Sequence, residues 1–434
     1  MEITLNLPIK DWYRNNTVND LRYWGLDYPP LTAYQSYVHG LFLRYFSPDT
    51  VALFASRGHE SYLGKLLMRW TVLSSDALVF FPAVLYFVLV YYAGQNPSRR
   101  RSDIAWHIAI ILLNPCLILI DHGHFQYNCI SLGLTMGAIS SVPSDKDLVA
   151  CVLYSLALNH KQMSAYFAHA FFSHLLGKCL RRRYPLLEVL KLGIVVLGTF
   201  IVVWWPYVHS TEDFLGVLSR LAPFERGIFE DYVANFWCTT SVLVKWKRLF
   251  PTQSLKLISL GATVSAFLPS MIQQIWSPSK PGFLYGLLNS AFSFYLFSFQ
   301  ASVHNFVILR CIMLVVLLAM EEPMLYTWMT LNALFSMFPL LHFILLNRVP
   351  NGRRATRDTS ALRSSVTTVS VLCSVVLHVV YLSVHPPARY PFLFEALIML
   401  VCFTQFVFLT LYANAKQWML LKDSKLVDKE KKHL

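Results

Sequence analysis

Long apolar stretches alternate with short polar loops over most of the 434-residue chain. A semi-polar region, residues 1–71, comes first and contains no such stretch. The apolar stretches then cover residues 72–94, 104–120, 125–141, 148–158, 162–177, 189–208, 254–276, 283–299, 306–319, 324–346, 366–384 and 392–414. Because a membrane-crossing helix needs ~20 residues and several stretches are shorter, the division within 104–177 stays open.

These stretches favour helices that cross a membrane. Only helices and closed barrels satisfy all backbone groups in lipid, and the two-residue alternation of barrel strands is missing here. The sequence therefore predicts an all-α polytopic membrane protein with about 12 transmembrane helices. We expect a luminal loop region at 1–71, a transmembrane helical bundle at 72–414 and a cytosolic basic tail at 415–434.

Composition supports a membrane protein over a soluble or nucleic-acid-binding one. Apolar residues make up 55% and charged residues 14%, against about 25% charged in soluble proteins. The net charge of +13 comes from basic runs beside the apolar stretches, which is the positive-inside pattern. The eight Cys residues lack CxxC pairing and zinc-ligand spacing, so no metal site is expected.

The basic runs also orient the chain. With Arg99–Arg101 in the cytosol, residues 1–71 and the loops near 121–124, 159–161, 209–250 and 300–305 lie on the far side. Nothing at the start resembles a signal peptide or a first span, so we expect a helix upstream of Met1. Membrane crossings counted forward from the N-terminal part and backward from a cytosolic C-terminus differ by one. The difference falls between residues 306 and 346.

The last four residues, Lys431-Lys432-His433-Leu434, have the spacing of a dilysine retrieval signal. This spacing is typical of a protein retained in the endoplasmic reticulum membrane. For such a multi-pass protein, the orientation set by the basic runs places the active face in the lumen. An ordinary basic cytosolic tail is the alternative interpretation.

Four polar or aromatic clusters lie on the predicted luminal side. The first is Tyr23-Trp24-Gly25-Leu26-Asp27-Tyr28-Pro29-Pro30. Its rings can stack on sugars, Asp27 can accept hydrogen bonds from hydroxyls, and the proline pair stiffens the loop. An interfacial aromatic belt would contain the same residue types.

The second cluster, residues 121–128, has the sequence DHGHFQYN and lies between two apolar stretches. Its polar side chains, Asp121, His122, His124 and Gln126 among them, are costly at membrane depth unless they line a wet cavity or a site. A structural hydrogen-bond network is the alternative. The spacing of Asp121 and the two His residues matches no standard metal template.

The third cluster contains Lys161 and Gln162. Lys161 can pair with a phosphate or with Asp121, or can extend to the membrane interface. The fourth, residues 220–238, predicts a short amphipathic helix at the membrane surface. Its charged residues are Arg220, Arg226, Glu230 and Asp231, and the helix could hold a lipid-linked anion. Sequence signatures of soluble nucleotide-binding, serine-hydrolase and zinc-protease sites are absent, as is an inverted repeat of the transporter kind.

Several of these segments resemble one enzyme family. They are YWGLDYPPLTAY, SRGHES, LIDHGHFQYN, the Lys161-Gln162 pair, RGIFEDYVANFWC and FSFQ. They are similar to the endoplasmic reticulum glucosyltransferases that use dolichyl-phosphate glucose, from residue 1 to about 300. Within the family, the likeness is strongest to enzymes that add the first glucose, in alpha-1,3 linkage, to the nine-mannose lipid-linked oligosaccharide. The second glucosyltransferase of the pathway is the alternative.

The resemblance implies a GT-C fold and a hexosyltransferase of protein N-glycosylation, without a cofactor. Its substrates would be dolichyl-phosphate glucose and a dolichyl-diphosphate-linked oligosaccharide, both reached from the lipid bilayer. It implies inversion without a required metal, with a carboxylate as base and with Arg, Lys and His side chains stabilising the phosphate. The implied substrate-binding residues are Tyr23, Trp24, Asp27, Tyr28, Asp121, His122, His124, Gln126, Lys161, Gln162, Arg226, Glu230, Asp231 and His304.

The chain departs from the family in three places. The family's catalytic carboxylate is expected upstream of Met1, which leaves the catalytic residue unassigned and Asp27 as a weak candidate. After FSFQ, the family's VHEK is replaced by VHNF, which keeps only His304 as a phosphate contact. Relatives also have another helix near 347–365. A catalytically inactive form that only binds dolichol-linked substrates is therefore an alternative to an active enzyme.

Overall fold

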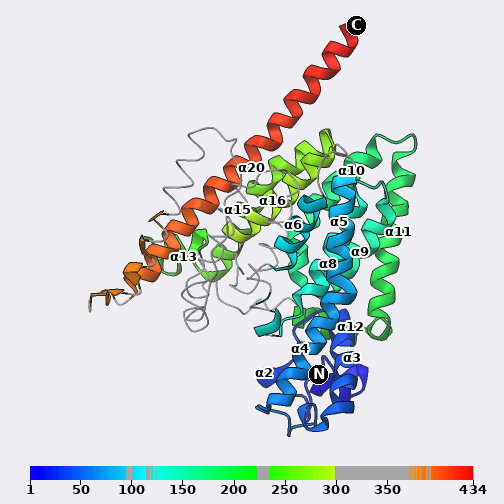
Figure 1. The fold of residues 1–434 in the computed structure, drawn as a ribbon, viewed down its shortest axis with the longest axis vertical. Coiled ribbons are helices and arrows are strands. Elements are labelled where there is room, and N and C mark those ends of the chain that lie inside the picture. Colours follow the sequence, from blue (N-terminus) through cyan, green and yellow to red (C-terminus); the bar gives the residue numbers. More distant parts are fainter. Residues whose placement is uncertain are drawn as a thin grey trace. The chain divides into compact units, whose positions relative to one another are not determined.

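The computed structural model describes residues 1–93, 101–113, 118, 121–123, 125–221, 234–298, 372–373, 376–377, 379–381, 383–387, 390 and 392–433. These residues form helices and loops, and no strand occurs among them (Figure 1). They fall into two compact units. Unit 1 comprises Met1–Ala168 and Lys178–Arg226, and unit 2 comprises His169–Gly177 and Gly227–Leu434.

The N-terminal part of unit 1 is built from short helices. These are α1 (Glu2–Asn6), η1 (Ile9–Asp11), α2 (Leu21–Trp24), α3 (Pro30–Phe46) and η2 (Pro48–Thr50). Asp20 caps α2 by accepting a hydrogen bond from the Arg22 N–H, and Pro30 begins α3, where its missing N–H costs nothing. Trp12 and Tyr13 are buried against residues of α11 and α12. This packing anchors the N-terminal part to the helices that follow.

The remaining helices of unit 1 are longer. They are α4 (Tyr62–Ser75), the π-helical turn η3 (Asp76–Phe80), α5 (Phe81–Ala93), α6 (Arg101–Leu112), α8 (Asn128–Ser141), α9 (Asp147–His160), η4 (Gln162–Phe167), α11 (Pro185–Trp204), η5 (Trp205–Tyr207) and α12 (Thr211–Leu221). Helix α10 (Ala168–Leu180) contributes to both units. Helices α5, α8, α9 and α11 pack side by side in that order (Figure 1).

Unit 2 contains α13 (Phe236–Thr240), α14 (Trp246–Leu249), α15 (Thr252–Trp276), α16 (Lys280–Phe297) and α20 (Leu393–His433). A buried amide network joins three of them. The Oε1 atom of Gln417 in α20 accepts hydrogen bonds from Ser270 in α15 at 2.5 Å and from Asn289 in α16 at 2.6 Å. Such polar contacts between apolar helices fix their register.

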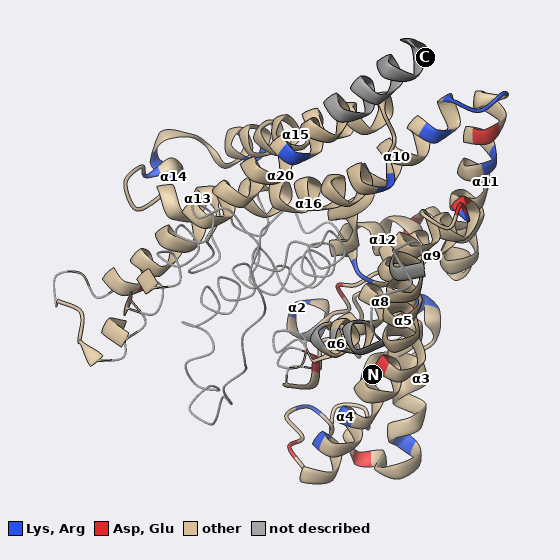
Figure 2. Ribbon diagram, turned by 45° about the horizontal axis from the view of Figure 1, so that its top comes forward, with Lys and Arg blue, Asp and Glu red and all other residues tan. Residues whose placement is uncertain are grey.

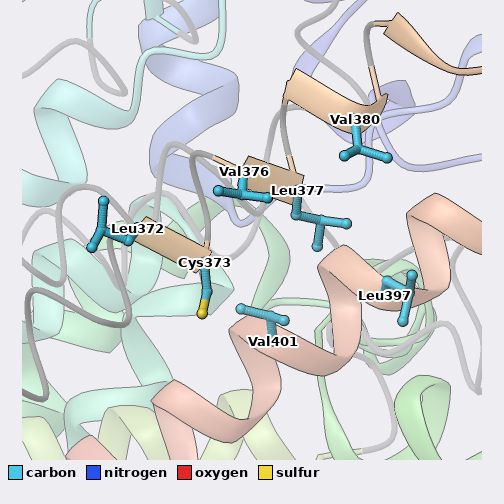
Figure 3. Close-up of a pocket in the computed structure, with 7 residues that line it drawn as sticks. All are labelled: Leu372, Cys373, Val376, Leu377, Val380, Leu397 and Val401. Carbon is cyan, nitrogen blue, oxygen red and sulfur yellow. The ribbon is translucent and has the colours of Figure 1, made fainter.

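Unit 2 also has an open apolar pocket of about 430 Å³ beside α20 (Figure 3). Its lining consists of Leu372, Cys373, Val376, Leu377, Val380, Leu397 and Val401. Because a phosphate or a sugar needs hydrogen-bonding partners, this lining does not suit either.

Four helical segments are long and apolar enough to cross a membrane, among the residues that the structure describes. They are Tyr62–Tyr91, Pro185–Tyr207, Thr252–Trp276 and Leu393–Leu421. Lys, Arg, Asp and Glu occur mostly at helix ends and in loops, and few interrupt the long helices (Figure 2). The helical membrane protein predicted from the sequence is therefore confirmed at this coarse level.

The helical segment Tyr62–Tyr91, one of the four candidate spans, begins before residue 71, so the end of the predicted luminal region is helical. Where the membrane begins along this segment stays a prediction. The predicted surface helix at 220–238 lies mostly outside the described residues, which include only the end of α12 and the start of α13. The stretches 306–319 and 324–346 also lie outside them.

We predict that Gly133→Ala destabilises unit 1. A methyl group on Gly133 of α8 would lie 2.8 Å from the Val79 carbonyl oxygen, so the backbone of the π turn would have to move. We expect a loss of about 1–3 kcal/mol, measured as a lower midpoint of thermal unfolding in detergent. Gly193→Ala in α11 is the matched control because an added methyl meets nothing within 4 Å. It should be neutral or slightly stabilising, and equal losses in both variants would contradict the prediction.

Candidate functional site

Three of the four clusters singled out in the sequence meet in unit 1. The ammonium of Lys161 donates a hydrogen bond to Gln126 Oε1 at 3.3 Å and lies over the Tyr28 ring, 4.7 Å from its centroid. Gln162 Nε2 donates to the backbone oxygen of Asp27 at 3.3 Å. The first, second and third clusters therefore form a single polar site.

Lys161 is the central cation of this site. Lys161 is 2% exposed, and it forms no ion pair with any of the described residues. Burial lowers the pKa of Lys161 to about 8, although the charge of Asp121 acts in the opposite direction. A buried ammonium held only by an amide oxygen and a ring is costly. This environment suits the binding of an anion that completes its coordination.

Asp121 organises the loop that precedes α8. Its carboxylate is fully buried and accepts hydrogen bonds from the backbone N–H groups of Asn128 at 3.0 Å and Cys129 at 2.7 Å. It thereby caps the N-terminus of α8, which Tyr127 at the cap position leaves uncapped. Burial raises the pKa of Asp121 to about 6, against the effect of the two N–H donors. Its oxygens are therefore already used within the chain.

The same loop contains backbone strain. Phe125 and Tyr127 have φ values of 56° and 52°, a region that non-glycine residues rarely adopt. The Tyr127 hydroxyl is hydrogen-bonded to Thr71 at 2.8 Å, and its ring lies 5.0 Å from that of His39. These contacts and the Asp121 cap hold the loop, so that Gln126 faces Lys161.

His122 has a partner that sequence reasoning missed. Its Nε2 atom lies 2.8 Å from the Asp76 carboxylate, which belongs to the π turn between α4 and α5. The signal was present, because Asp76 is the only charged residue between Thr71 and Tyr91 and a carboxylate in a membrane span is a functional candidate.

The first cluster is held by arginines from elsewhere in unit 1. Asp27 forms an ion pair with Arg220 of α12, and Arg220 also donates to the Leu26 carbonyl at 3.4 Å. Tyr23 is 60% exposed, with the Arg57 guanidinium 5.1 Å from its ring centroid. Arg220 belongs to the fourth cluster, where it was named as one of the charged residues. Arg57 belongs to the SRGHES segment and was not predicted to contact the first cluster.

Some expected site residues cannot be placed. His124, Arg226, Glu230, Asp231 and His304 lie outside the described residues, as does the side chain of Trp24. Among the residues that are described, no three His, Cys, Asp or Glu side chains lie close enough to hold a metal ion.

Comparison with known proteins fits a site of this kind. The profile of the ALG6, ALG8 glycosyltransferase family matches residues 1–412. The chain belongs to this family. A relative from Arabidopsis thaliana, named probable dolichyl pyrophosphate Man9GlcNAc2 alpha-1,3-glucosyltransferase, is 61% identical over 100% of this chain and 85% of its own length.

Other relatives of the family carry the same activity in their names. The dolichyl pyrophosphate Man9GlcNAc2 alpha-1,3-glucosyltransferase of Rattus norvegicus is 39% identical over 95% of this chain and 88% of its own length. The Saccharomyces cerevisiae enzyme of the same name is 43% identical over 79% of this chain and 63% of its own length. Membership of this family makes the chain a hexosyltransferase.

We predict that the buried charge of Lys161, which suits the binding of an anion, destabilises the fold. Lys161→Met should raise the free energy of unfolding by on the order of 1 kcal/mol, because it removes a buried charge that forms no ion pair with the described residues. Lys178→Met is the matched control. It should lower stability by about 1–2 kcal/mol, because Lys178 pairs with Asp147 at 2.7 Å and Asp145 at 3.0 Å.

Thermal unfolding of both variants in the same detergent checks this contrast. A loss of stability in Lys161→Met as large as in Lys178→Met would show that Lys161 is a structural residue.

Proposed function

We propose that this chain transfers the first glucose, in alpha-1,3 linkage, from dolichyl-phosphate glucose to the nine-mannose lipid-linked oligosaccharide used in protein N-glycosylation. The observation that carries the proposal is the buried Lys161, which lies beside the Tyr28 ring and forms no ion pair with the described residues. It supplies a positive charge for a lipid phosphate next to an aromatic loop suited to a sugar. The names of the relatives supply the linkage and the acceptor.

The architecture proposed with this function is a GT-C bundle of about 12 transmembrane helices. It would lie in the endoplasmic reticulum membrane with the site on the luminal face, a loop region at 1–71 and a cytosolic tail at 415–434. The four membrane-length helices support the bundle, and the basic runs beside apolar stretches support the orientation. The helix α3, which the proline pair starts, supports an ordered rather than extended luminal region.

The proposed reaction is a displacement at the anomeric carbon of the glucose. An acceptor hydroxyl forms the new carbon–oxygen bond while the bond to the phosphate oxygen breaks, and the phosphate leaves with the electron pair. The hydroxyl proton passes to a carboxylate base. Lys161 stabilises the negative charge that grows on the phosphate, and does so most strongly because water is excluded around it.

The roles of the other residues follow from their contacts. Gln126 accepts a hydrogen bond from the Lys161 ammonium and so orients it. Gln162 donates a hydrogen bond to the backbone oxygen of Asp27 and so fixes that part of the loop. Tyr23, with its exposed ring, is placed to stack on a sugar. Asp27 is engaged by Arg220 and would have to release this partner before it accepted a proton. We therefore assign Asp27 to sugar binding and leave the base unassigned.

The second glucosyltransferase of the pathway is the competing assignment. Its acceptor already has one glucose, so the two activities differ in the sugar that receives the new bond. The relatives' names specify the acceptor without glucose, which favours the first transfer.

The test is glucose transfer in membranes that contain the full chain, supplied with dolichyl-phosphate glucose and either the nine-mannose acceptor or its monoglucosylated form. We expect transfer to the nine-mannose acceptor only, and a reduction of kcat/KM by about 10–100-fold in Lys161→Met. Lys191→Met, an exposed lysine of α11 that pairs with Glu188, is the control and should leave transfer unchanged.

Preference for the monoglucosylated acceptor would move the assignment to the second transfer. Binding of both substrates without transfer by the intact chain would favour a form that only binds dolichol-linked substrates.

A further inference from the structure

Asp76 is a buried carboxylate that the mechanism above does not use. Its side chain is 7% exposed, within a helix that otherwise has no charge from Thr71 to Tyr91. It occupies the first position of the π-helical turn, an irregularity that often marks functional sites. A lone carboxylate in such a position needs a partner to offset its desolvation.

The π turn is held firmly against α8. The backbone of Val79 and Phe80 lies so close to Gly133 that a methyl group there would be 2.8 Å from the Val79 oxygen and 2.9 Å from the Phe80 Cα atom. Because the loop 121–127 leads directly into α8, this contact fixes the π turn relative to that loop. Asp76 is therefore held in place by backbone packing.

His122 is held from two directions. Its neighbour Asp121 anchors the backbone to the N-terminus of α8, and its own Nε2 atom is paired with Asp76 at 2.8 Å. The ring is 27% exposed, and its Nδ1 atom makes no hydrogen bond to the part of the chain that the structure describes. Asp76 thus sets the ring orientation and leaves Nδ1 available.

A doubly protonated imidazole has an N–H on each ring nitrogen. When Nε2–H donates to Asp76, the N–H on Nδ1 is free to donate to an anion. Four residues along the same loop, Gln126 contacts the Lys161 ammonium. The loop therefore presents His122 near one end and meets the Lys161 ammonium near the other.

We propose that Asp76 is a positioning residue, which orients His122 so that its Nδ1–H donates to a phosphate oxygen of the lipid-linked substrate. This inference deepens the proposed function and rests on it for the class of ligand. The phosphate can belong to the monophosphate donor or to the diphosphate acceptor, because both offer the same oxygen chemistry. Asp76 acts on the ligand through His122, and its carboxylate is also hydrogen-bonded to the Cys129 side chain at the start of α8.

The test is equilibrium binding of two water-soluble probes, citronellyl phosphate and citronellyl diphosphate, to the full chain in lipid nanodiscs. Asp76→Asn and His122→Gln should each weaken binding by about tenfold, the usual effect of losing one charge-assisted hydrogen bond. The double variant should bind no more weakly than His122→Gln alone, because Asp76 acts only through His122. If Asp76 had only a structural role, the double variant would bind the probes more weakly than His122→Gln alone.

Two controls keep the result specific. Citronellol, which has no phosphate, should bind all forms equally. Asp147→Asn removes a carboxylate that pairs with Lys178 and Arg182, and should leave phosphate binding unchanged. If Asp76→Asn fails to fold, as judged by thermal unfolding, the partly exposed His122→Gln variant still decides whether the imidazole binds phosphate.

The outcomes separate the two proposals. A larger loss for the monophosphate assigns the contact to the donor, and a larger loss for the diphosphate assigns it to the acceptor. Four results would each overturn the inference. The first two are unchanged phosphate binding in His122→Gln and an equal loss of binding for citronellol. The others are losses that multiply in the double variant and no phosphate binding by the unchanged chain. Failure of glucose transfer with phosphate binding intact would instead overturn the proposed function.

Discussion

The burial of Asp121 is the constraint on which the rest of the site depends. A carboxylate with no exposed surface needs donors, and the first N–H groups of α8 supply two. That bond ties the strained loop to the helix, with Phe125 and Tyr127 both at positive φ. The loop then presents His122 on one side and Gln126 on the other. The cap therefore fixes the backbone from which both side chains extend.

Two buried charged residues of this apolar chain differ in the partners that surround them. Asp147 is buried and pairs with Lys178 and Arg182, so its charge is compensated within the fold. Lys161 is also buried, yet within the described residues it contacts an amide oxygen and an aromatic ring and no carboxylate. In the first arrangement, removing one partner would leave a buried charge unpaired. The second leaves charge for a ligand, and a glycosyltransferase that handles lipid phosphates uses such a charge.

In the described part of the chain, the apolar stretches correspond to helices, because helix position in a membrane protein follows from local hydropathy. The helix that contains the first stretch begins earlier, at Tyr62, because a helix can continue through charged residues such as Lys65 and Arg69. Asp76 was overlooked because polar residues were sought between the apolar stretches and not within them. The role of Asp121 as a cap was not predictable, because its partners follow at Asn128 and Cys129, outside the usual capping interval.

The sequence by itself determined a helical membrane protein, its family and the polar clusters in which a site should lie. Only the tertiary structure decided which members of those clusters meet. Lys161 and Gln126 are 35 residues apart in the chain, and Asp76 and His122 are 46 apart. Hydropathy is a property of each segment alone, whereas an ion pair depends on how distant segments pack. The pairing of Asp76 with His122 exists because Gly133 lets the π turn approach α8.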